Sequence, residues 1–159
     1  FVRKNYILSC ENKGEFFMTK INELYKCEVC GNIVEVVHAS CGELVCCSQT
    51  MSKVKPQKEV AEFSEKHYPV LIKDDDGNYI IRVGEIEHPM EKEHYIMFIE
   101  AISKDKKYLK RVYLEPHERP ILDPSCTCRH FDARELCNIH GLFESPLIKE
   151  DELKNEDEE

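Results

Sequence analysis

The sequence predicts an all-β protein in which a small metal-stapled module precedes a larger β-sandwich or barrel. Two observations indicate β-structure. Segments rich in Ile, Val, Tyr and Phe alternate with turn-forming residues, and prolines recur late in the chain, where they disfavour a long helix. A third observation indicates the module, because cysteines cluster in a stretch too short to fold by burial alone.

The first seventeen residues differ from the rest. They start without a methionine and lack a small-residue cleavage site, whereas Met18-Thr19-Lys20 reads as an ordinary start. We therefore expect residues 1–17 to be a non-native or disordered leader.

Composition divides the remainder into four segments. Residues 18–52 are cysteine-rich and form the expected metal module, and residues 53–62 are polar and read as a linker. Residues 63–146 hold six of the seven histidines and form the expected β-sandwich domain. Residues 147–159 are expected to be an acidic disordered tail, since 149–159 contain seven acids and two lysines without apolar periodicity.

Three strands are predicted within the larger domain. Residues 79–85 follow the turn-forming run 74–78, and residues 94–102 are rich in Ile, Tyr and Phe. Residues 107–114 alternate with period two and carry apolar residues on both faces, as a strand inside a sandwich would. One face would present Tyr108, Val112 and Leu114, and the other Leu109 and Tyr113.

Bulk properties exclude several classes of function. The net charge of −9 argues against a nucleic-acid partner, and no apolar run approaches the roughly 20 residues that a membrane-spanning helix requires. Nine cysteines without a secretory signal favour metal ligation over a disulfide framework, and they indicate a cytoplasmic protein.

The first group of candidate ligands consists of Cys27, Cys30, Cys46 and Cys47. Two thiolates two residues apart can point at one metal from a tight turn, and Gly31 can adopt the positive φ that such a turn often needs. Cys46 and Cys47 are adjacent, so both can reach one metal only if the backbone kinks. Tetrahedral sulfur sites suit iron and zinc alike, so the spacing leaves both metals open. Cys41 is either a further ligand or a small buried cysteine.

The run Tyr25-Lys26-Cys27-Glu28-Val29-Cys30-Gly31, followed by Gly42-Glu43-Leu44-Val45-Cys46-Cys47, resembles desulforedoxin and the N-terminal domain of the desulfoferrodoxin family. The fifteen residues between Cys30 and Cys46 are part of the match. The resemblance implies an iron tetrathiolate held by the four cysteines, with Cys41 outside the pattern.

The second group of candidate ligands is His67, His88, His94, Cys137 and His140. Any one of these histidines could be an ordinary core or surface residue. Together, and beside Pro69, Pro89 and Gly141, they indicate a site assembled from separate loops of fixed geometry. Four imidazoles and one thiolate suit a redox-active iron better than a structural zinc, which prefers a closed tetrahedron.

Residues 65–141 resemble the C-terminal domain of the desulfoferrodoxins and the neelaredoxins, the superoxide reductases. The resemblance implies an immunoglobulin-like β-sandwich and two iron ions per chain. It also implies that the four histidines are equatorial ligands of the second iron and that Cys137 is the axial one.

The resemblance further implies one-electron reduction of superoxide to hydrogen peroxide, without release of oxygen. Lys66 would steer the anion and organise proton delivery, and Glu65 would occupy the sixth position of the resting ferric iron. Either residue could instead be an ordinary solvated side chain. A rubredoxin-like electron donor and a homodimer are implied as well. The competing interpretations are a non-enzymatic iron electron-transfer protein, a zinc-stapled binding module and a superoxide dismutase.

The chain departs from the family pattern at two places. Cys126, Cys128 and His130 form an extra cluster that could bind a metal or form a disulfide, although unliganded loop residues are the simpler interpretation. Leu142-Phe143 replaces the more usual His-Trp after His140-Gly141. His38 and His117 are expected to be ordinary histidines.

Overall fold

A computed structural model of the chain describes residues 18–57, 65–125 and 130–148. It divides at Lys55 and Pro56 into two compact units, and every strand pair is antiparallel. The all-β prediction is therefore confirmed. The expected leader and residues 149–159 of the expected tail lie outside the described residues. Within the described ranges, no helix has the length and apolar character needed to cross a membrane.

Unit 1 is a small sheet joined to a hairpin. The sheet has the order β2-β1-β5, formed by β1 (Leu24–Lys26), β2 (Ile33–Glu35) and β5 (Ser52–Lys53). The hairpin consists of β3 (Val45–Cys46) and β4 (Gln49–Thr50). One cluster of buried residues consists of Tyr25, Cys27, Val36 and Met51, with Leu44 and Cys46 packed against them, and Leu24 is buried as well.

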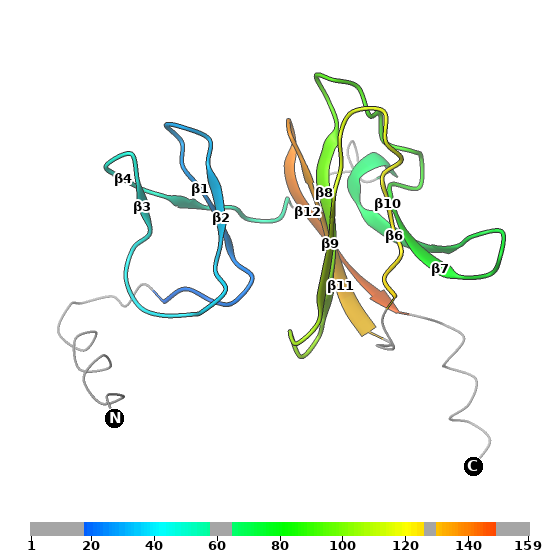
Figure 1. The fold of residues 1–159 in the computed structure, drawn as a ribbon, viewed down its shortest axis with the longest axis horizontal. Coiled ribbons are helices and arrows are strands. Elements are labelled where there is room, and N and C mark those ends of the chain that lie inside the picture. Colours follow the sequence, from blue (N-terminus) through cyan, green and yellow to red (C-terminus); the bar gives the residue numbers. More distant parts are fainter. Residues whose placement is uncertain (1–17, 58–64, 126–129, 149–159) are drawn as a thin grey trace, which may run out of the picture. The chain divides into compact units, whose positions relative to one another are not determined.

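Unit 2 consists of two antiparallel sheets (Figure 1). The four-stranded sheet has the order β12-β11-β8-β9, with β8 (Ile96–Ser103), β9 (Leu109–Tyr113), β11 (His130–Cys137) and β12 (Gly141–Ile148). The three-stranded sheet has the order β10-β7-β6, with β6 (Pro69–Lys73), β7 (Tyr79–Val83) and β10 (Ile121–Leu122). The strands predicted from residues 79–85, 94–102 and 107–114 correspond to β7, β8 and β9.

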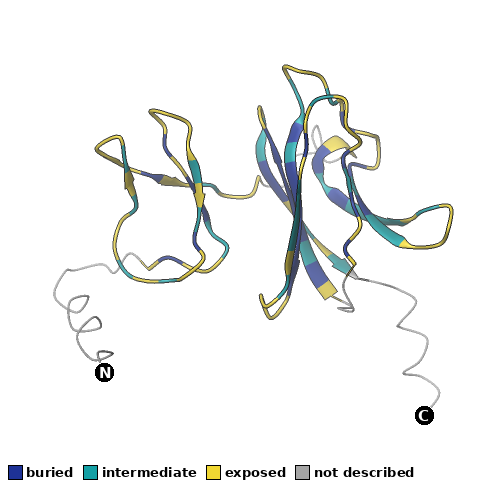
Figure 2. Cartoon of the chain, viewed as in Figure 1, coloured by how far each residue is buried: buried dark blue, intermediate teal, exposed yellow. Residues whose placement is uncertain are grey.

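The hydrophobic core lies between these two sheets. Ile81 and Val83 of β7 pack with Ile99 of β8 and Ala133 of β11, and each of these residues is fully buried. Figure 2 shows the long run of buried residues along β8 and β11. Burial of this apolar surface supplies the main driving force for folding of the unit.

Strand β9 is buried on one face only. Val112 and Leu114 pack into the core as expected, whereas Leu109 is 37% exposed and Tyr113 is 71% exposed. Both faces of β9 carry apolar residues, as predicted, but only one of them packs against the core. On the outer face, the guanidinium of Arg111 lies 5.1 Å from the centre of the Phe98 ring and 5.6 Å from that of Tyr113.

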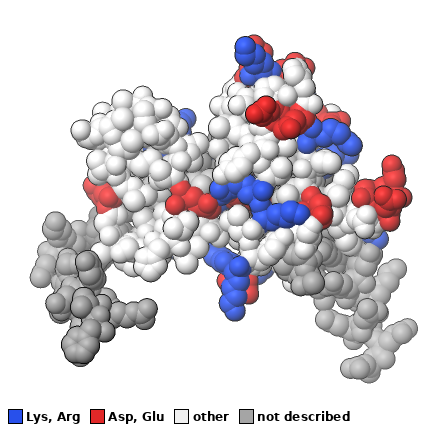
Figure 3. All heavy atoms as spheres, in the orientation of Figure 1, with Lys and Arg blue, Asp and Glu red and all other residues white. Residues whose placement is uncertain are grey.

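The outer face of the four-stranded sheet also holds a buried ion cluster. The carboxylate of Glu100 is fully buried and pairs with Arg111 and Arg134 from the strands on either side. Lys104 and Asp132 form an ion pair nearer the surface. Figure 3 shows basic and acidic side chains interspersed over the surface of unit 2. Such exposed pairs contribute little to stability.

Candidate metal centres

The first centre begins in a tight turn between β1 and β2. The backbone N–H of Gly31 donates to the carbonyl of Cys27 at 2.9 Å, and the N–H of Cys27 donates to the carbonyl of Asn32 at 2.9 Å. Gly31 has a φ of 78°, which is the conformation expected for it from the sequence. This turn brings the thiols of Cys27 and Cys30 to the same side.

The adjacent cysteines are presented by a kink, as their spacing requires. Cys47 and Ser48 both have left-handed backbone conformations, with φ of 50° and 61°. The Sγ of Cys46 lies 3.6 Å from that of Cys30 and 3.9 Å from that of Cys47. The ligand atoms of Cys27, Cys30, Cys46 and Cys47 all lie within 4.8 Å of one another.

The electrostatics of this group fit a bound cation. Backbone amides of Cys30 and Val29 lower the pKa of Cys27 to about 7, and so they stabilise a thiolate there. Contacts with Cys30, Cys46 and Cys27 raise the pKa of Cys47 to about 12. Four sulfurs this close cannot all ionise in isolation, whereas a metal cation makes the tetrathiolate favourable.

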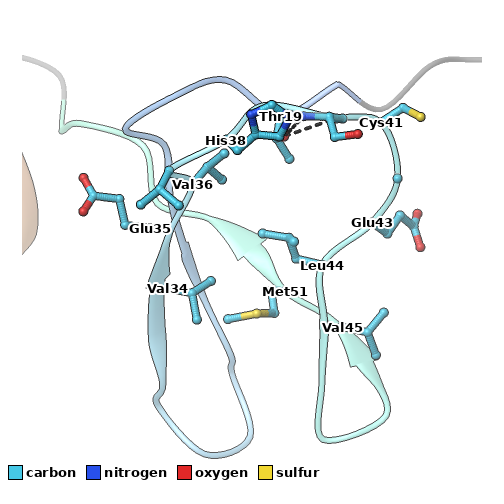
Figure 4. A pocket seen from close by; sticks show the side chains of 13 residues that line it. Thr19, Val34, Glu35, Val36, His38, Cys41, Glu43, Leu44, Val45 and Met51 are labelled. Atoms are coloured by element: carbon cyan, nitrogen blue, oxygen red, sulfur yellow. Dashed lines mark hydrogen bonds between the residues drawn. The ribbon is translucent and has the colours of Figure 1, made fainter. Parts of the chain in front are cut away.

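Cys41 lies apart from this group. It is disulfide-bonded, and it lines an apolar groove of about 490 Å³ in unit 1 together with Val36, Leu44 and Met51. Figure 4 shows the groove and the side chain of Cys41 at its margin. The interpretation of Cys41 as a small buried cysteine is therefore wrong, because this side chain is half-buried and disulfide-bonded.

The second centre is a ring of four imidazoles in unit 2. Neighbouring rings are 4.5–4.8 Å apart between centroids, in the order His67, His88, His94, His140 and back to His67. His67 and His94 are 6.1 Å apart across the ring. The structure thus brings together the four histidines singled out in the sequence.

Cys137 lies against this ring. Its Sγ is 3.7 Å from Nδ1 of His140 and 3.9 Å from Nε2 of His88. The ligand atoms of all five residues lie within 4.8 Å of one another, although the residues come from three separate segments. His67 ends a helical turn, His88 and His94 lie in the loop before β8, and Cys137 and His140 lie at the junction of β11 and β12.

Burial disfavours the charged forms of several residues in this site. Desolvation and the neighbouring imidazoles lower the pKa of His67 to about 3, and the same causes lower that of His88 to about 4. Desolvation raises the pKa of the Cys137 thiol. The buried Nε2 of His94 has no hydrogen-bond partner among the described residues.

These features fit a metal ion bound by the five side chains. Neutral imidazole nitrogens are metal ligands, and an unpartnered buried nitrogen that a metal would occupy is otherwise costly. The donor set of four imidazoles and one thiolate suits iron, and the tetrathiolate suits a second iron. Phe143 stacks on His67 with 4.4 Å between ring centroids, so the departure from the family at this position still supports a ligand ring.

Lys66 and Glu65 are exposed beside the second centre, in the helical turn that ends at His67. The charge of Lys66 contributes to the lowered pKa values of His67, His88 and His94, which places its positive charge near the imidazole ring. The carbonyl of Glu65 accepts a hydrogen bond from the N–H of Ile86 at 2.9 Å. The turn is thereby docked on the loop after β7.

Sequence reasoning missed two residues that hold the site. Glu135 on β11 is fully buried, and its Oε1 lies 3.1 Å from Nδ1 of His67. Gly84 has a φ of 79°, and a Cβ there would lie 2.7 Å from the carbonyl oxygen of Lys66. A glutamate in a strand and a glycine after a strand carry no distinctive sequence signal. The one available signal is that Glu135 lies two positions before the predicted ligand Cys137.

The other described residues that the sequence singled out belong to neither ligand group. His38 and His117 are exposed, and neither belongs to a described metal-ligand group. His130 is exposed at the start of β11, whereas Cys126 and Cys128 lie outside the described residues.

Comparison with known proteins places both units in one family. Residues 19–54 match the family model "Desulfoferrodoxin, N-terminal domain", and residues 59–146 match the family model "Desulfoferrodoxin". A desulfoferrodoxin homolog from Archaeoglobus fulgidus is 45% identical over 128 residues, which cover 80% of this chain and 99% of that protein. A protein from Pyrococcus abyssi named superoxide reductase is 32% identical over 99 residues, covering 52% of this chain and 86% of the relative.

The fold has a counterpart among solved structures. The superoxide reductase from Treponema pallidum aligns with a TM-score of 0.57 and 21% identity, over 79% of this chain and 99% of that one. At this identity the likeness bears on the fold alone. The family models and the 45% identical relative show that the chain belongs to the desulfoferrodoxin family.

Proposed function

We propose that this chain is a superoxide reductase, which reduces superoxide by one electron to hydrogen peroxide with uptake of two protons. The observation that carries the proposal is the grouping of four imidazoles and one thiolate in unit 2. Iron held by this group supplies the electron for superoxide. A relative named superoxide reductase matches 52% of the chain at 32% identity, which supports the same activity.

Within this proposal, His67, His88, His94, Cys137 and His140 hold the catalytic iron, and Cys27, Cys30, Cys46 and Cys47 hold the second iron. Their mutual distances support both assignments. The tetrathiolate metal stabilises unit 1, whose apolar core is too small to do so alone.

Lys66 attracts the substrate anion, and its ammonium group organises proton delivery. Its exposure and its electrostatic effect on three of the imidazoles support this role. Glu65, which neighbours it, is proposed as the carboxylate that ligates the oxidised iron at rest. The side chain of Glu65 is exposed, which supports access to small ions.

The wider setting is carried over from the family resemblance. We propose a rubredoxin-like protein as electron donor, a homodimer and a cytoplasmic location. We also propose residues 18–52 as the metal module, 53–62 as the linker and 63–146 as the catalytic domain. The unit division at Lys55 and Pro56 falls inside this linker, and β12 continues to Ile148, two residues beyond the proposed domain end.

The test is a product balance on protein purified without oxygen. The full chain should contain two irons, consume superoxide and form peroxide without releasing oxygen. Release of oxygen would instead show a dismutase, zinc in both sites would show a stapled binding module, and failure to consume superoxide would leave an electron carrier.

Two matched variants assign each absorption band to one of the two iron sites. Cys137→Ser should abolish the thiolate charge-transfer absorption of the catalytic iron and leave that of the tetrathiolate intact. Cys30→Ser should disturb the tetrathiolate absorption and leave the charge-transfer absorption of the catalytic iron intact. Persistence of the catalytic-site absorption in Cys137→Ser would remove Cys137 from the ligand set.

A further inference from the structure

The turn between β11 and β12 carries two of the five proposed iron ligands, Cys137 and His140. It is a short turn in which Gly141 has a φ of 84°. Because the other three ligands come from distant segments, the position of this turn relative to those segments decides whether the five ligand atoms converge.

Asn138 ties this turn to the segment that carries His94. Its Nδ2 donates to the carbonyl of Glu93 at 3.0 Å, and its Oδ1 accepts from the N–H of Tyr95 at 2.9 Å. The backbone N–H of Asn138 also donates to the carbonyl of Tyr95 at 3.1 Å. Glu93 and Tyr95 flank His94, so both sides of that ligand are fixed to the turn.

Gln57 ties the other side of the same turn to the segment that carries His67. Its Nε2 donates to the carbonyl of His140 at 2.9 Å, and its backbone N–H donates to the carbonyl of Leu142 at 2.7 Å. Its carbonyl accepts from the hydroxyl of Tyr68, the neighbour of His67, at 3.3 Å. Gln57 belongs to unit 2, so all of these contacts lie within that unit.

We propose that the side-chain amides of Asn138 and Gln57 are positioning residues, which hold the Cys137–His140 turn in place for iron before the metal binds. The amide of Asn138 ties the turn to the segment that carries His94, and the amide of Gln57 holds the carbonyl of His140 itself. The inference rests on the proposed function only in that the five residues hold iron.

The physical reason is preorganisation. A metal site built from separate segments must otherwise order those segments when the ion binds, which weakens binding. An amide offers a donor and an acceptor on one short side chain, so a single Asn138 can fix two backbone groups of a facing loop. Partners of this kind, one contact beyond the ligands, typically change metal affinity by about 10–100-fold.

The test compares Asn138→Ala and Gln57→Ala with Asn78→Ala in the full-length, iron-loaded protein. Asn78 is the matched control, since it is an exposed amide that donates to Asp74 in a remote turn of unit 2. The measurement is the rate at which a chelator removes iron, followed separately at the absorption of each site. The tetrathiolate iron serves as an internal reference.

Asn138→Ala and Gln57→Ala should lose the catalytic-site iron at least about tenfold faster than the wild type, and the charge-transfer absorption of that site should shift. In both variants the tetrathiolate iron should be lost at the wild-type rate. In Asn78→Ala both irons should be lost at the wild-type rate. Loss at the wild-type rate from both variants would overturn the proposal. A lowered unfolding temperature with unchanged spectrum and iron loss would also overturn it, because that result shows only a structural role.

A second measurement uses iron-free protein and does not depend on activity. The amide hydrogen of Tyr95 should exchange faster in Asn138→Ala than in the wild type. Asn138→Asp keeps the acceptor and should preserve this protection. Equal exchange in Asn138→Ala and the wild type would show that the turn is not held in advance. Absence of iron from the wild-type site would instead overturn the proposed function, and the inference with it.

Discussion

Nδ1 of His67 lies 3.1 Å from Oε1 of Glu135, and both side chains are almost completely excluded from solvent. With Nδ1 carrying the proton and donating it to Glu135, Nε2 is left to face the other ligands, where it lies 2.9 Å from Nδ1 of His140. Glu135 thus fixes the ring orientation and tautomer of a proposed iron ligand.

Metal binding should release more protons from the wild type than from Glu135→Gln. Burial raises the pKa of Glu135 well above its usual value, which favours the neutral carboxyl in the metal-free protein. A bound cation favours the carboxylate, and the proton leaves. Because binding releases protons, metal affinity rises with pH, and it should rise less steeply in Glu135→Gln.

Calorimetric titration of metal-free protein with ferrous ion, in buffers of different ionisation enthalpy, measures this release. Contributions from the tetrathiolate site and from Cys137 are common to both proteins and cancel in the difference. Equal proton release would show that Glu135 is already ionised before the metal binds.

Gly84→Ala should disturb the second centre, although Gly84 is not a ligand. A Cβ at this position would collide with the backbone carbonyls of Lys66 and Ile86, neither of which can move like a flexible side chain. The turn that carries His67 would therefore shift. We expect a lower unfolding temperature and faster loss of the catalytic-site iron.

Gly77→Ala is the matched control for this change. Gly77 has a similar φ of 83°, but a Cβ there meets nothing within 4 Å. It should show the cost of backbone strain alone, about 1 kcal/mol. Equal effects of the two substitutions on iron retention would mean that the contact between Gly84 and the Lys66 backbone does not position the site.

Lys66→Ala should slow the capture of superoxide and weaken its dependence on ionic strength. A single positive charge beside the site attracts the anion over about 10 Å, and added salt screens that attraction. Lys92→Ala removes an exposed charge of the same sign from the His94 loop and serves as control. Stopped-flow capture rates across a salt series make the measurement, and identical rates for Lys66→Ala and the wild type would remove Lys66 from the steering role.

The sequence indicated the proposed ligands better than the residues that hold them. Histidine and cysteine are chemically distinctive, and proline or glycine beside them marked fixed loops. Glu135 and Asn138 gave no such signal, because their partners are far away in the sequence. Glu135 contacts His67 in the turn before β6, and Asn138 contacts the loop before β8.

The same limit applies to the strands. β7, β8 and β9 show runs of β-branched and aromatic residues. β11 instead contains two adjacent buried charged residues, Arg134 and Glu135, which interrupt the apolar pattern. β12 contains Pro146, which would be unsuitable in a central strand. It is tolerated because β12 is the edge of its sheet.

Removal of the tetrathiolate metal should unfold unit 1 and leave unit 2 folded. Few buried apolar residues of unit 1 are described, and one of them, Cys27, is itself a proposed ligand, so little apolar burial remains there once the metal is lost. A structural metal in so small a domain supplies much of its folding free energy, of the order of 10 kcal/mol. Unit 2 has its own core between two sheets and needs no such support.

Amide NMR spectra of Cys30→Ser should therefore lose the dispersed signals of residues 18–54 alone, with Cys137→Ser as the control that retains them. Dispersed signals from unit 1 in metal-free Cys30→Ser would show that the polypeptide folds there without its metal.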